Sequence, residues 1–494
     1  MSGSLATGLA VLVPLIGVLF IAAAHRHPNH REAATLATAA ALFILVVSLV
    51  RPVMGGARPG LELVEIFPGL ALAFEVEPLG LLFALVASFL WIVTSIYSIG
   101  YMRGHNEQNQ TRFYISFAIA LSAAIGVAFA ANMLTLFVCY EMLTLSTYPL
   151  VTHSGDDKAR RSGRIYLGIL LGTSIGFQLL AILWTWSLAG TLDFTVGGIL
   201  AGKASPGLVS VLLVLYIFGI GKAALMPFHR WLPAAMVAPT PVSALLHAVA
   251  VVKAGVFTVL KVSVYIFGLD LLSQVEASRW LMYVAAGTIL IASVTAMRQD
   301  NLKLRLAYST ISQLSYIVLG AMLANGLGVI GGGMHIAMHA FGKITLFFCA
   351  GAIMVAAHKT EISEMYGIGR VMPVTMAAFL IGSLSIIGAP PMAGLWSKWH
   401  LVLGTLEADS YVMLGVFLTS SLLSVGYLMP LAMRAFFVAP GEGAAGNPGN
   451  PETRGVKEAP LPCLIAISVS ALGCIVLFLF PEPVHHLMTL VVAQ

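Results

Sequence analysis

The sequence predicts an all-α polytopic membrane protein, and two observations carry this prediction. Hydrophobic residues make up 59% of the 494 residues and charged residues only 10%, whereas about 25% of the residues of a soluble protein are charged. Runs of roughly 20 apolar residues also recur along the chain, and each is long enough to cross a hydrocarbon core of about 30 Å. The composition therefore argues against a soluble fold.

The apolar runs and the turn signals between them predict about fourteen transmembrane helices. The first run starts close to Met1 without a basic leader or cleavage site, which predicts a retained span and not a signal peptide. A Gly- and Pro-rich stretch at 439–460 predicts a flexible cytoplasmic loop. The helices are expected near residues 5–24, 33–50, 78–101, 113–131, 133–152, 164–189, 207–228, 240–266, 279–297, 302–323, 328–357, 374–403, 411–433 and 461–480.

The basic residues predict the orientation, because Lys and Arg concentrate in cytoplasmic loops. With the N-terminus outside, 17 of the 26 fall in or beside inner loops and four in or beside outer ones. This asymmetry predicts that both termini lie outside, and it explains the net charge of +5 without a nucleic acid partner. The other five basic residues fall inside predicted helices: Lys222, Lys253, Lys261, Lys343 and Lys398.

A lone carboxylate lies in the predicted helix at 133–152. Glu141 occurs in "FVCYEMLTLS", while the other 20 of the 21 acidic residues fall in loops or at predicted helix ends. A charge near the bilayer centre costs at least about 3 kcal/mol, so ionisable groups there usually face the protein interior and mark ion pathways. The alternative interpretation of Glu141 is a static ion pair that holds two helices together.

Two of the buried lysines lie beside helix-breaking residues. Lys222 occurs in "YIFGIGKAALMPFHRWLP" and Lys398 in "IIGAPPMAGLWSKWH". Pro removes a backbone donor and Gly loosens packing, so both helices are expected to break there. Broken helices at membrane depth are tolerated where they line a polar cavity, and a pair of them in two halves of a chain points to an ion path. The alternative for Lys222 is that it reaches to the membrane interface.

The run "HIAMHAFGKITLFFC" places His335, His339 and Lys343 on one helical face over about 12 Å. Two histidines at this spacing suit zinc, but the glutamate of H-E-x-x-H is missing. Haem ligation would need partners on other helices, and packing is the third alternative. A proton relay fits best, and neither a metal nor a cofactor is predicted.

One further helix carries both His247 and Lys253, in "PTPVSALLHAVAVVKAGVF". Six positions rotate the two side chains by about 240°, so they contact different neighbours. Lys261 lies near the predicted outer end of the same helix, where reaching to the interface is the simpler explanation.

Buried Glu, Lys and His can change charge state at modest energetic cost, so a row of them can pass protons across the protein interior. The chain has no Walker loop, no G-x-G-x-x-G that enters a helix after a strand, and no cysteine set for an iron-sulfur cluster. Its four cysteines all fall in apolar runs and are expected to be packing residues. A transporter subunit without a redox centre of its own is therefore expected, and any redox chemistry must belong to partner subunits.

Six features occur in order along nearly the whole chain: Glu141, Lys222, "APTPVSALLHA" (238–248), "DNLKLRLAYSTISQLSY" (300–316), "MHAFGKITLFF" (338–348) and "GAPPMAGLWSKW" (388–399). With them the sequence resembles the antiporter-like membrane subunits. This family is shared by Mrp-type multisubunit cation/proton antiporters, respiratory complex I and membrane-bound hydrogenases. Among these the short chain looks most like the D-type Mrp subunit, because it lacks the lateral helix and extra C-terminal spans of the largest members.

The resemblance implies fourteen helices in two inverted five-helix repeats, helices 4–8 and 9–13, with helices 7 and 12 broken. On this basis we expect an N-terminal three-helix segment at 1–112, the repeats at 113–266 and 279–437, and a cytoplasmic loop with the last helix at 438–494. It also implies an integral protein of the prokaryotic plasma (inner) membrane that assembles with other membrane subunits.

The resemblance further implies a role for each buried group. Glu141 matches the glutamate that pairs with the lysine of helix 7, here Lys222. The helix-8 position is matched by His247 or Lys253, and the helix-11 positions are matched by His335, His339 and Lys343. Lys398 matches the lysine of helix 12, where some relatives carry glutamate.

The implied function is proton translocation along this relay, in a multisubunit monovalent cation (Na⁺)/proton antiporter. Two alternatives belong to the same family: a proton-pumping subunit of a redox-driven complex, either complex I-like or a membrane-bound hydrogenase, and a subunit of a bicarbonate-uptake complex. A purely structural scaffold is the third. No cluster of carboxylates suits a dedicated Na⁺ site, so any sodium path is expected mainly on another subunit.

Overall fold

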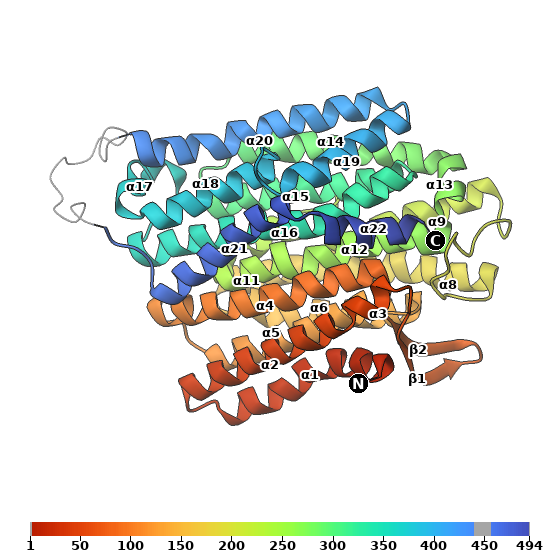
Figure 1. Cartoon of the computed structure of the whole chain (residues 1–494), viewed down its shortest axis with the longest axis horizontal. Helices are drawn as coiled ribbons and strands as arrows, with labels where there is room; N and C mark the ends of the chain where they lie inside the picture. The colour runs from red at the N-terminus through yellow and green to blue at the C-terminus, as the bar shows by residue number, and fades with distance from the viewer. Residues whose placement is uncertain (1, 439–455, 494) are drawn as a thin grey trace.

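The computed structural model of the chain describes residues 2–438 and 456–493, apart from the side chains of Leu246 and His247. Most helices run side by side in roughly one direction and form a bundle (Figure 1). The predicted cytoplasmic loop at 439–460 falls almost entirely outside the described residues.

Ten helical stretches among the described residues have the length and apolar composition to cross a membrane. They agree with predicted spans to within a few residues, except that α2 and α7 begin earlier than expected. The stretches are α1 (Gly3–Ala23), α2 (Pro28–Ser48) with α3 (Val50–Met54), α4 (Pro78–Gly104), α5 (Gln110–Ala128), α6 (Met133–Val151), α7 (Asp157–Thr173) with η1 (Ser174–Gln178) and α8 (Leu179–Ala189), α14 (Glu276–Arg298), α16 (Gly326–Ala357), α20 (Tyr411–Phe437) and α21 (Leu461–Leu479).

The other four predicted spans are helical but are interrupted or more polar. Two of them break where the prolines and glycines predict, and this expectation is confirmed. The elements are α9 (Pro206–Gly219), η2 (Gly221–Ala223), α10 (Trp231–Ala234) and η3 (Ala235–Val237); α11 (Thr240–Ala244), η4 (Leu245–Val249), α12 (Val251–Val262) and η5 (Ser263–Phe267); α15 (Leu302–Met322); and α18 (Pro373–Ile387) with α19 (Gly394–Glu407). Short helices α13 (Leu269–Gln274), η6 (Ile362–Glu364) and α17 (Ile368–Val371) lie in connections.

A two-stranded hairpin departs from the all-α prediction. Strands β1 (Gly60–Phe67) and β2 (Leu70–Glu75) pair antiparallel between α3 and α4. Pro68 and Gly69 form the turn, and Gly69 has a φ of +77°, which Pro–Gly turns of this kind require. A further helix, α22 (Glu482–Val492), follows the last predicted span and was also not expected.

Two long, deeply buried helices, α12 and α16, form the centre of the bundle. Every residue of α12 is buried, as is every residue of α16 from Gly328 to Ile353. Helix α16 packs against α4, α15, α18, α19 and α21 and lies in the middle of the bundle (Figure 1). Polar side chains on these two helices therefore face protein on all sides.

Candidate functional site

The break before α10 buries Lys222 completely. Its ammonium donates to the carbonyl oxygen of Tyr140 at 2.8 Å and to Thr144 Oγ1 at 2.6 Å, and it lies 3.1 Å from the centre of the Tyr140 ring. The broken backbone is also capped by side chains. Lys222 N donates to the Tyr140 hydroxyl at 3.1 Å, and Trp231 Nε1 donates to the Gly221 carbonyl at 2.9 Å. The lysine is thus held by neutral oxygens and a π face.

Glu141 does not make the predicted direct contact with Lys222. In the described part of the chain no ion pair joins the two residues, and both carboxylate oxygens of Glu141 are buried without a hydrogen-bond partner. Glu141 instead lines a groove of about 630 Å³ on the outer face of α5 and α6. The physical reason is helical geometry, because Tyr140 and Thr144 present the face of α6 that meets Lys222, and Glu141 is rotated about 100° away from Tyr140.

Lys253 and His339 form the closest contact among the predicted residues. Lys253 Nζ lies 2.6 Å from His339 Nδ1, and both side chains are buried. The contact joins α12 to α16 at the centre of the bundle. A lysine and an imidazole at hydrogen-bond distance can exchange one proton between them.

Helix α12 crosses the broken helix closely at Gly255. Gly255 lies against the backbone of Lys222 and Ala223, and a Cβ atom at Gly255 would clash with that backbone. Glycine is therefore required where these two segments cross. Lys253 is two positions from Gly255, so its side chain lies about 200° around α12 from this crossing and is directed to His339 on α16.

The other histidine of the stripe contacts the second broken helix. His335 Nδ1 lies 2.9 Å from Ser397 Oγ, and its ring stacks on Tyr316 with centroids 5.7 Å apart. The ring of His339 follows at 5.5 Å from that of His335. The predicted polar stripe on α16 is therefore placed inside the protein, between α12 and α19.

The last two predicted residues contact hydroxyl groups. Lys343 Nζ donates to Ser309 Oγ at 2.8 Å, and Lys398 Nζ donates to Ser421 Oγ at 3.1 Å and to the Ile387 carbonyl at 3.0 Å. The Ile387 carbonyl becomes available because α18 ends there. Both lysines are buried. His247 lies in the π-helical turn η4, and its side chain falls outside the described residues.

An ion pair that the sequence analysis missed lies further along α12. Lys261 is 1% exposed, and its Nζ is 3.2 Å from Glu77 Oε1 and 3.1 Å from the carbonyl oxygen of Ala130. The interpretation that Lys261 reaches to the interface is wrong, because its ammonium lies in the interior against Glu77 and the ring of Phe194. Glu77 precedes Pro78 at the start of α4 and accepts bonds from the backbone of Leu79 and Gly80. The acidic cap before Pro was a visible signal for Glu77, but nothing local indicated its partner.

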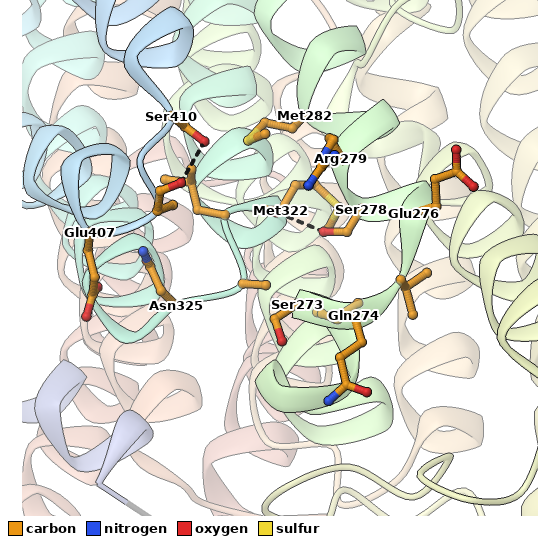
Figure 2. Close-up of a pocket in the computed structure, with 15 residues that line it drawn as sticks. Ser273, Gln274, Glu276, Ser278, Arg279, Met282, Met322, Asn325, Glu407 and Ser410 are labelled. Atoms are coloured by element: carbon orange, nitrogen blue, oxygen red, sulfur yellow. Dashed lines mark hydrogen bonds between the residues drawn. The ribbon is translucent and has the colours of Figure 1, made fainter.

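A pocket of about 500 Å³ lies apart from these residues, between the start of α14 and the turns that precede α16 and α20. Figure 2 shows Arg279 beside Ser278 in this pocket, with Glu276 and Glu407 on opposite sides. None of the predicted residues lines it. Glu407 ends α19, about 14 Å along the helix axis from Lys398. Among the described residues no group of three or more His, Cys, Asp or Glu can hold a metal ion.

The fold and the buried row of lysines and histidines define a class of helical membrane subunits that move protons. Residues 130–424 match the family described as "NADH:quinone oxidoreductase/Mrp antiporter, TM", and residues 69–114 match "NADH-Ubiquinone oxidoreductase (complex I), chain 5 N-terminus". Since the first match covers more than half of the chain, the protein belongs to this family of proton-pumping, antiporter-like membrane subunits.

Individual relatives come from several kinds of complex. The chain is 34% identical to "NADH-quinone oxidoreductase subunit N" of Desulforudis audaxviator over 84% of both chains. It is 30% identical to "Hydrogenase-4 component B" of Escherichia coli, over 83% of this chain and 62% of that one. The chain spans about half the length of the matched "NAD(P)H-quinone oxidoreductase chain 5" of Synechocystis, with 49% of that protein covered at 32% identity.

The fold is shared with a solved Mrp complex. A chain of the "Structure of Mrp complex from Dietzia sp." matches with a TM-score of 0.86 over 99% of this chain and 97% of that one, at 20% identity. A chain of the membrane-bound sulfane sulfur reductase, "an archaeal respiratory membrane complex", matches with a TM-score of 0.85, covering 98% and 96% at 23% identity. At these identities the likeness concerns the fold alone.

Proposed function

We propose that the chain is the proton-translocating subunit of a multisubunit monovalent cation (Na⁺)/proton antiporter, in the position of the D-type Mrp subunit. Its partners are the other membrane subunits of that complex. The observation that carries the proposal is the buried bond of 2.6 Å between Lys253 and His339, with Lys222, Lys343 and Lys398 buried in the same interior.

The proton path follows from these contacts. When the Lys253 ammonium gives its proton to His339 Nδ1, one positive charge moves from α12 to α16 and the amine of Lys253 becomes neutral. In this proposal Lys222, held by Thr144 and the Tyr140 carbonyl, returns a proton to Lys253. His335 and Lys343, on the face of α16 that carries His339, extend the path toward Lys398. Because every group is surrounded by protein, the path excludes bulk water except at its ends.

Glu141 supplies the carboxylate of this path without a fixed ion pair. Its oxygens are buried, and the residue lines a groove on the surface of α5 and α6. A carboxylate in this position is available to a neighbouring subunit or to a proton that enters from the groove. Glu141 is therefore the proposed entry or gating end of the relay, and it affects Lys222 through the adjacent Tyr140.

The proposal is tested by Glu141→Ala and Lys222→Ala in vesicles that contain the assembled complex. Cation-dependent proton exchange, followed with a pH-sensitive dye, is expected to fall by about 100-fold or more in each variant, because the relay loses a proton-carrying group. Lys203→Ala is the matched control, since Lys203 is exposed in the loop before α9. Wild-type exchange in both relay variants would contradict the proposal.

A second candidate is a proton-pumping subunit of a redox-driven complex. The match over 84% of both chains to "NADH-quinone oxidoreductase subunit N" favours it. The same relay would then be driven by electron transfer in partner subunits. Purification of the intact complex separates the two candidates: iron-sulfur or flavin absorbance supports the redox-driven complex, and its absence supports the antiporter.

The third alternative, a purely structural scaffold without transport activity, is tested with a substitution that preserves the shape of a side chain. Lys398→Met keeps the length and shape of the side chain but removes its charge. A scaffold predicts unchanged proton exchange in this variant, whereas a relay through Lys398 predicts a large loss.

A further inference from the structure

Lys343 and Lys398 belong to different helices, and the described contacts do not include a direct bond between them. Each lysine instead donates to a hydroxyl group on a neighbouring helix. Lys343 donates to Ser309 of α15, and Lys398 donates to Ser421 of α20. The connection between the two lysines therefore depends on the residues that lie between α15 and α20.

A continuous row of hydroxyl groups leads from Lys343 into α20. Ser309 Oγ lies 2.9 Å from the Tyr427 hydroxyl, and that hydroxyl lies 3.0 Å from Ser424 Oγ. All three side chains are buried. The bonds between Lys343, Ser309 and Tyr427 cross between helices, whereas most hydroxyl groups in membrane helices bond to a carbonyl one turn back on their own helix. Thr310, the next residue to Ser309, does make such a local bond, to the carbonyl of Leu306.

The charge of Lys343 sets the direction of these hydrogen bonds. A protonated lysine only donates, and each hydroxyl carries one hydrogen. With Lys343 charged, Ser309 accepts from it and keeps its own hydrogen to donate to Tyr427, and Tyr427 can then donate to Ser424. Ser424 then donates to the carbonyl oxygen of Ser420 at 2.9 Å. When Lys343 is neutral, its amine can accept a hydrogen bond from Ser309, and the whole row can reverse.

Such a row can carry a proton without forming a charged hydroxyl that persists. Lys343 gives one proton to Ser309, while the hydroxyl hydrogen of Ser309 moves to Tyr427 and that of Tyr427 moves to Ser424. Ser424 keeps the hydrogen from Tyr427 and, after its hydroxyl turns from the Ser420 carbonyl, releases its own hydrogen on the side of α20 that carries Ser421 and Lys398. Ser424 and Ser421 are one helical turn apart, at the i, i+3 spacing that places side chains next to each other, and the proposed last transfer between them passes through a bridging water. A neutral Lys398 amine takes up the proton, so the charges of the two lysines exchange.

We propose that Ser309, Tyr427 and Ser424 form the proton connection between Lys343 and Lys398. This inference rests on the proposed function, because it assigns the relay groups that join two of its lysines. The buried charged residues alone give a path through α6, the break at Lys222, α12, α16 and α19. The hydroxyl groups add α15 and α20 to this path.

The test uses substitutions that remove one oxygen atom each. Tyr427→Phe and Ser309→Ala are expected to lower proton exchange by about tenfold or more in vesicles with the assembled complex. Two control substitutions each remove a buried hydroxyl group that lies outside the row. Tyr97→Phe removes a buried hydroxyl that donates to the Phe348 carbonyl, and Ser122→Ala removes a buried hydroxyl that donates to the Val11 carbonyl. Both controls are expected to stay within about twofold of the wild type, since neither group lies between the lysines.

Ser309→Thr distinguishes a role of Ser309 in proton transfer from a role in packing. It restores the hydroxyl while adding a methyl group, so a relay predicts recovery of exchange relative to Ser309→Ala, and a packing role predicts none. If Tyr427→Phe prevents assembly, the pair at Ser309 decides the question. Wild-type exchange in Ser309→Ala, together with loss of exchange in Lys343→Ala, would overturn the hydroxyl connection and leave the proposed function intact. Wild-type exchange in Lys343→Ala would instead contradict the proposed function.

Discussion

The buried lysines of this protein are held in two different ways. Lys222, Lys343 and Lys398 are bonded to carbonyl and hydroxyl oxygens, and Lys253 is bonded to an imidazole. Lys261, in contrast, is paired with the carboxylate of Glu77 and lies beside the ring of Phe194. A neutral partner leaves a lysine able to lose its proton, whereas a buried carboxylate holds the charge in place. We therefore interpret Lys261 as structural and the other four as relay groups.

This distinction predicts a large effect of Lys261→Met on stability. The substitution leaves the Glu77 carboxylate buried without its counter-charge, which is expected to lower the free energy of unfolding by about 3–5 kcal/mol. The double variant Glu77→Gln with Lys261→Met removes both charges, and the amide oxygen can still accept the backbone bonds at the start of α4. It is expected to recover most of the loss. Thermal unfolding of the solubilised complex measures both, and equal losses in the two variants would contradict the ion-pair interpretation.

At the scale of elements, the helix breaks create the polar interior. An unbroken helix satisfies its own backbone, so it offers a buried lysine few acceptors. The end of α18 frees the Ile387 carbonyl for Lys398, and the break after α9 brings Lys222 to the carbonyl of Tyr140. Side chains such as Trp231 satisfy the groups that the breaks expose. Non-helical backbone is tolerated at membrane depth for this reason.

The crossing of α12 with the break at Lys222 is predicted to require glycine. Gly255→Ala places a Cβ atom against the backbone of Lys222 and Ala223, so the two segments must separate. Proton exchange is expected to fall by about tenfold, since displacement of relay groups by about 1 Å has effects of this size or larger. Gly287→Ala is the matched control, because a Cβ atom there meets nothing within 4 Å. Equal exchange in the two variants would show that this crossing does not position the lysines.

At the scale of the whole molecule, the termini lie on the side of the bundle away from α17 (Figure 1). The hairpin of β1 and β2 lies on the same side as the termini. The excess of basic residues in the opposite loops predicts that the opposite side faces the cytoplasm. The hairpin is therefore expected to face outside.

Labelling of introduced cysteines tests this orientation. The four native cysteines are buried, so we expect little background labelling from them. Glu62→Cys in the hairpin is expected to react with a membrane-impermeant maleimide in intact cells. Lys158→Cys, near the start of α7, is expected to react only after permeabilisation. Both native side chains are exposed, so accessibility alone does not separate them. The reverse pattern would contradict the predicted topology.

The sequence alone was sufficient to predict the fold class, the helical segments and the places where two helices break. These features depend on apolar length and on Pro and Gly, which act within one segment. The same local signals identified seven of the residues whose side chains the structure places in the polar interior or beside it: Glu141, Lys222, Lys253, His335, His339, Lys343 and Lys398. The hairpin and helix α22 were not predicted. The turn residues Pro68 and Gly69 are the local signal that could have predicted the hairpin.

Only the tertiary structure decided which groups meet. Glu141 and Lys222 were expected to touch, but the face of α6 that meets Lys222 carries Tyr140 and Thr144. Lys261 pairs with Glu77, 184 positions away in the sequence, and Lys343 reaches Tyr427 through Ser309. The physical reason is that burial follows from the composition of one helix, whereas a partner depends on how two helices are rotated and where they cross. That information is shared among residues far apart in the chain, and packing of the bundle brings it together.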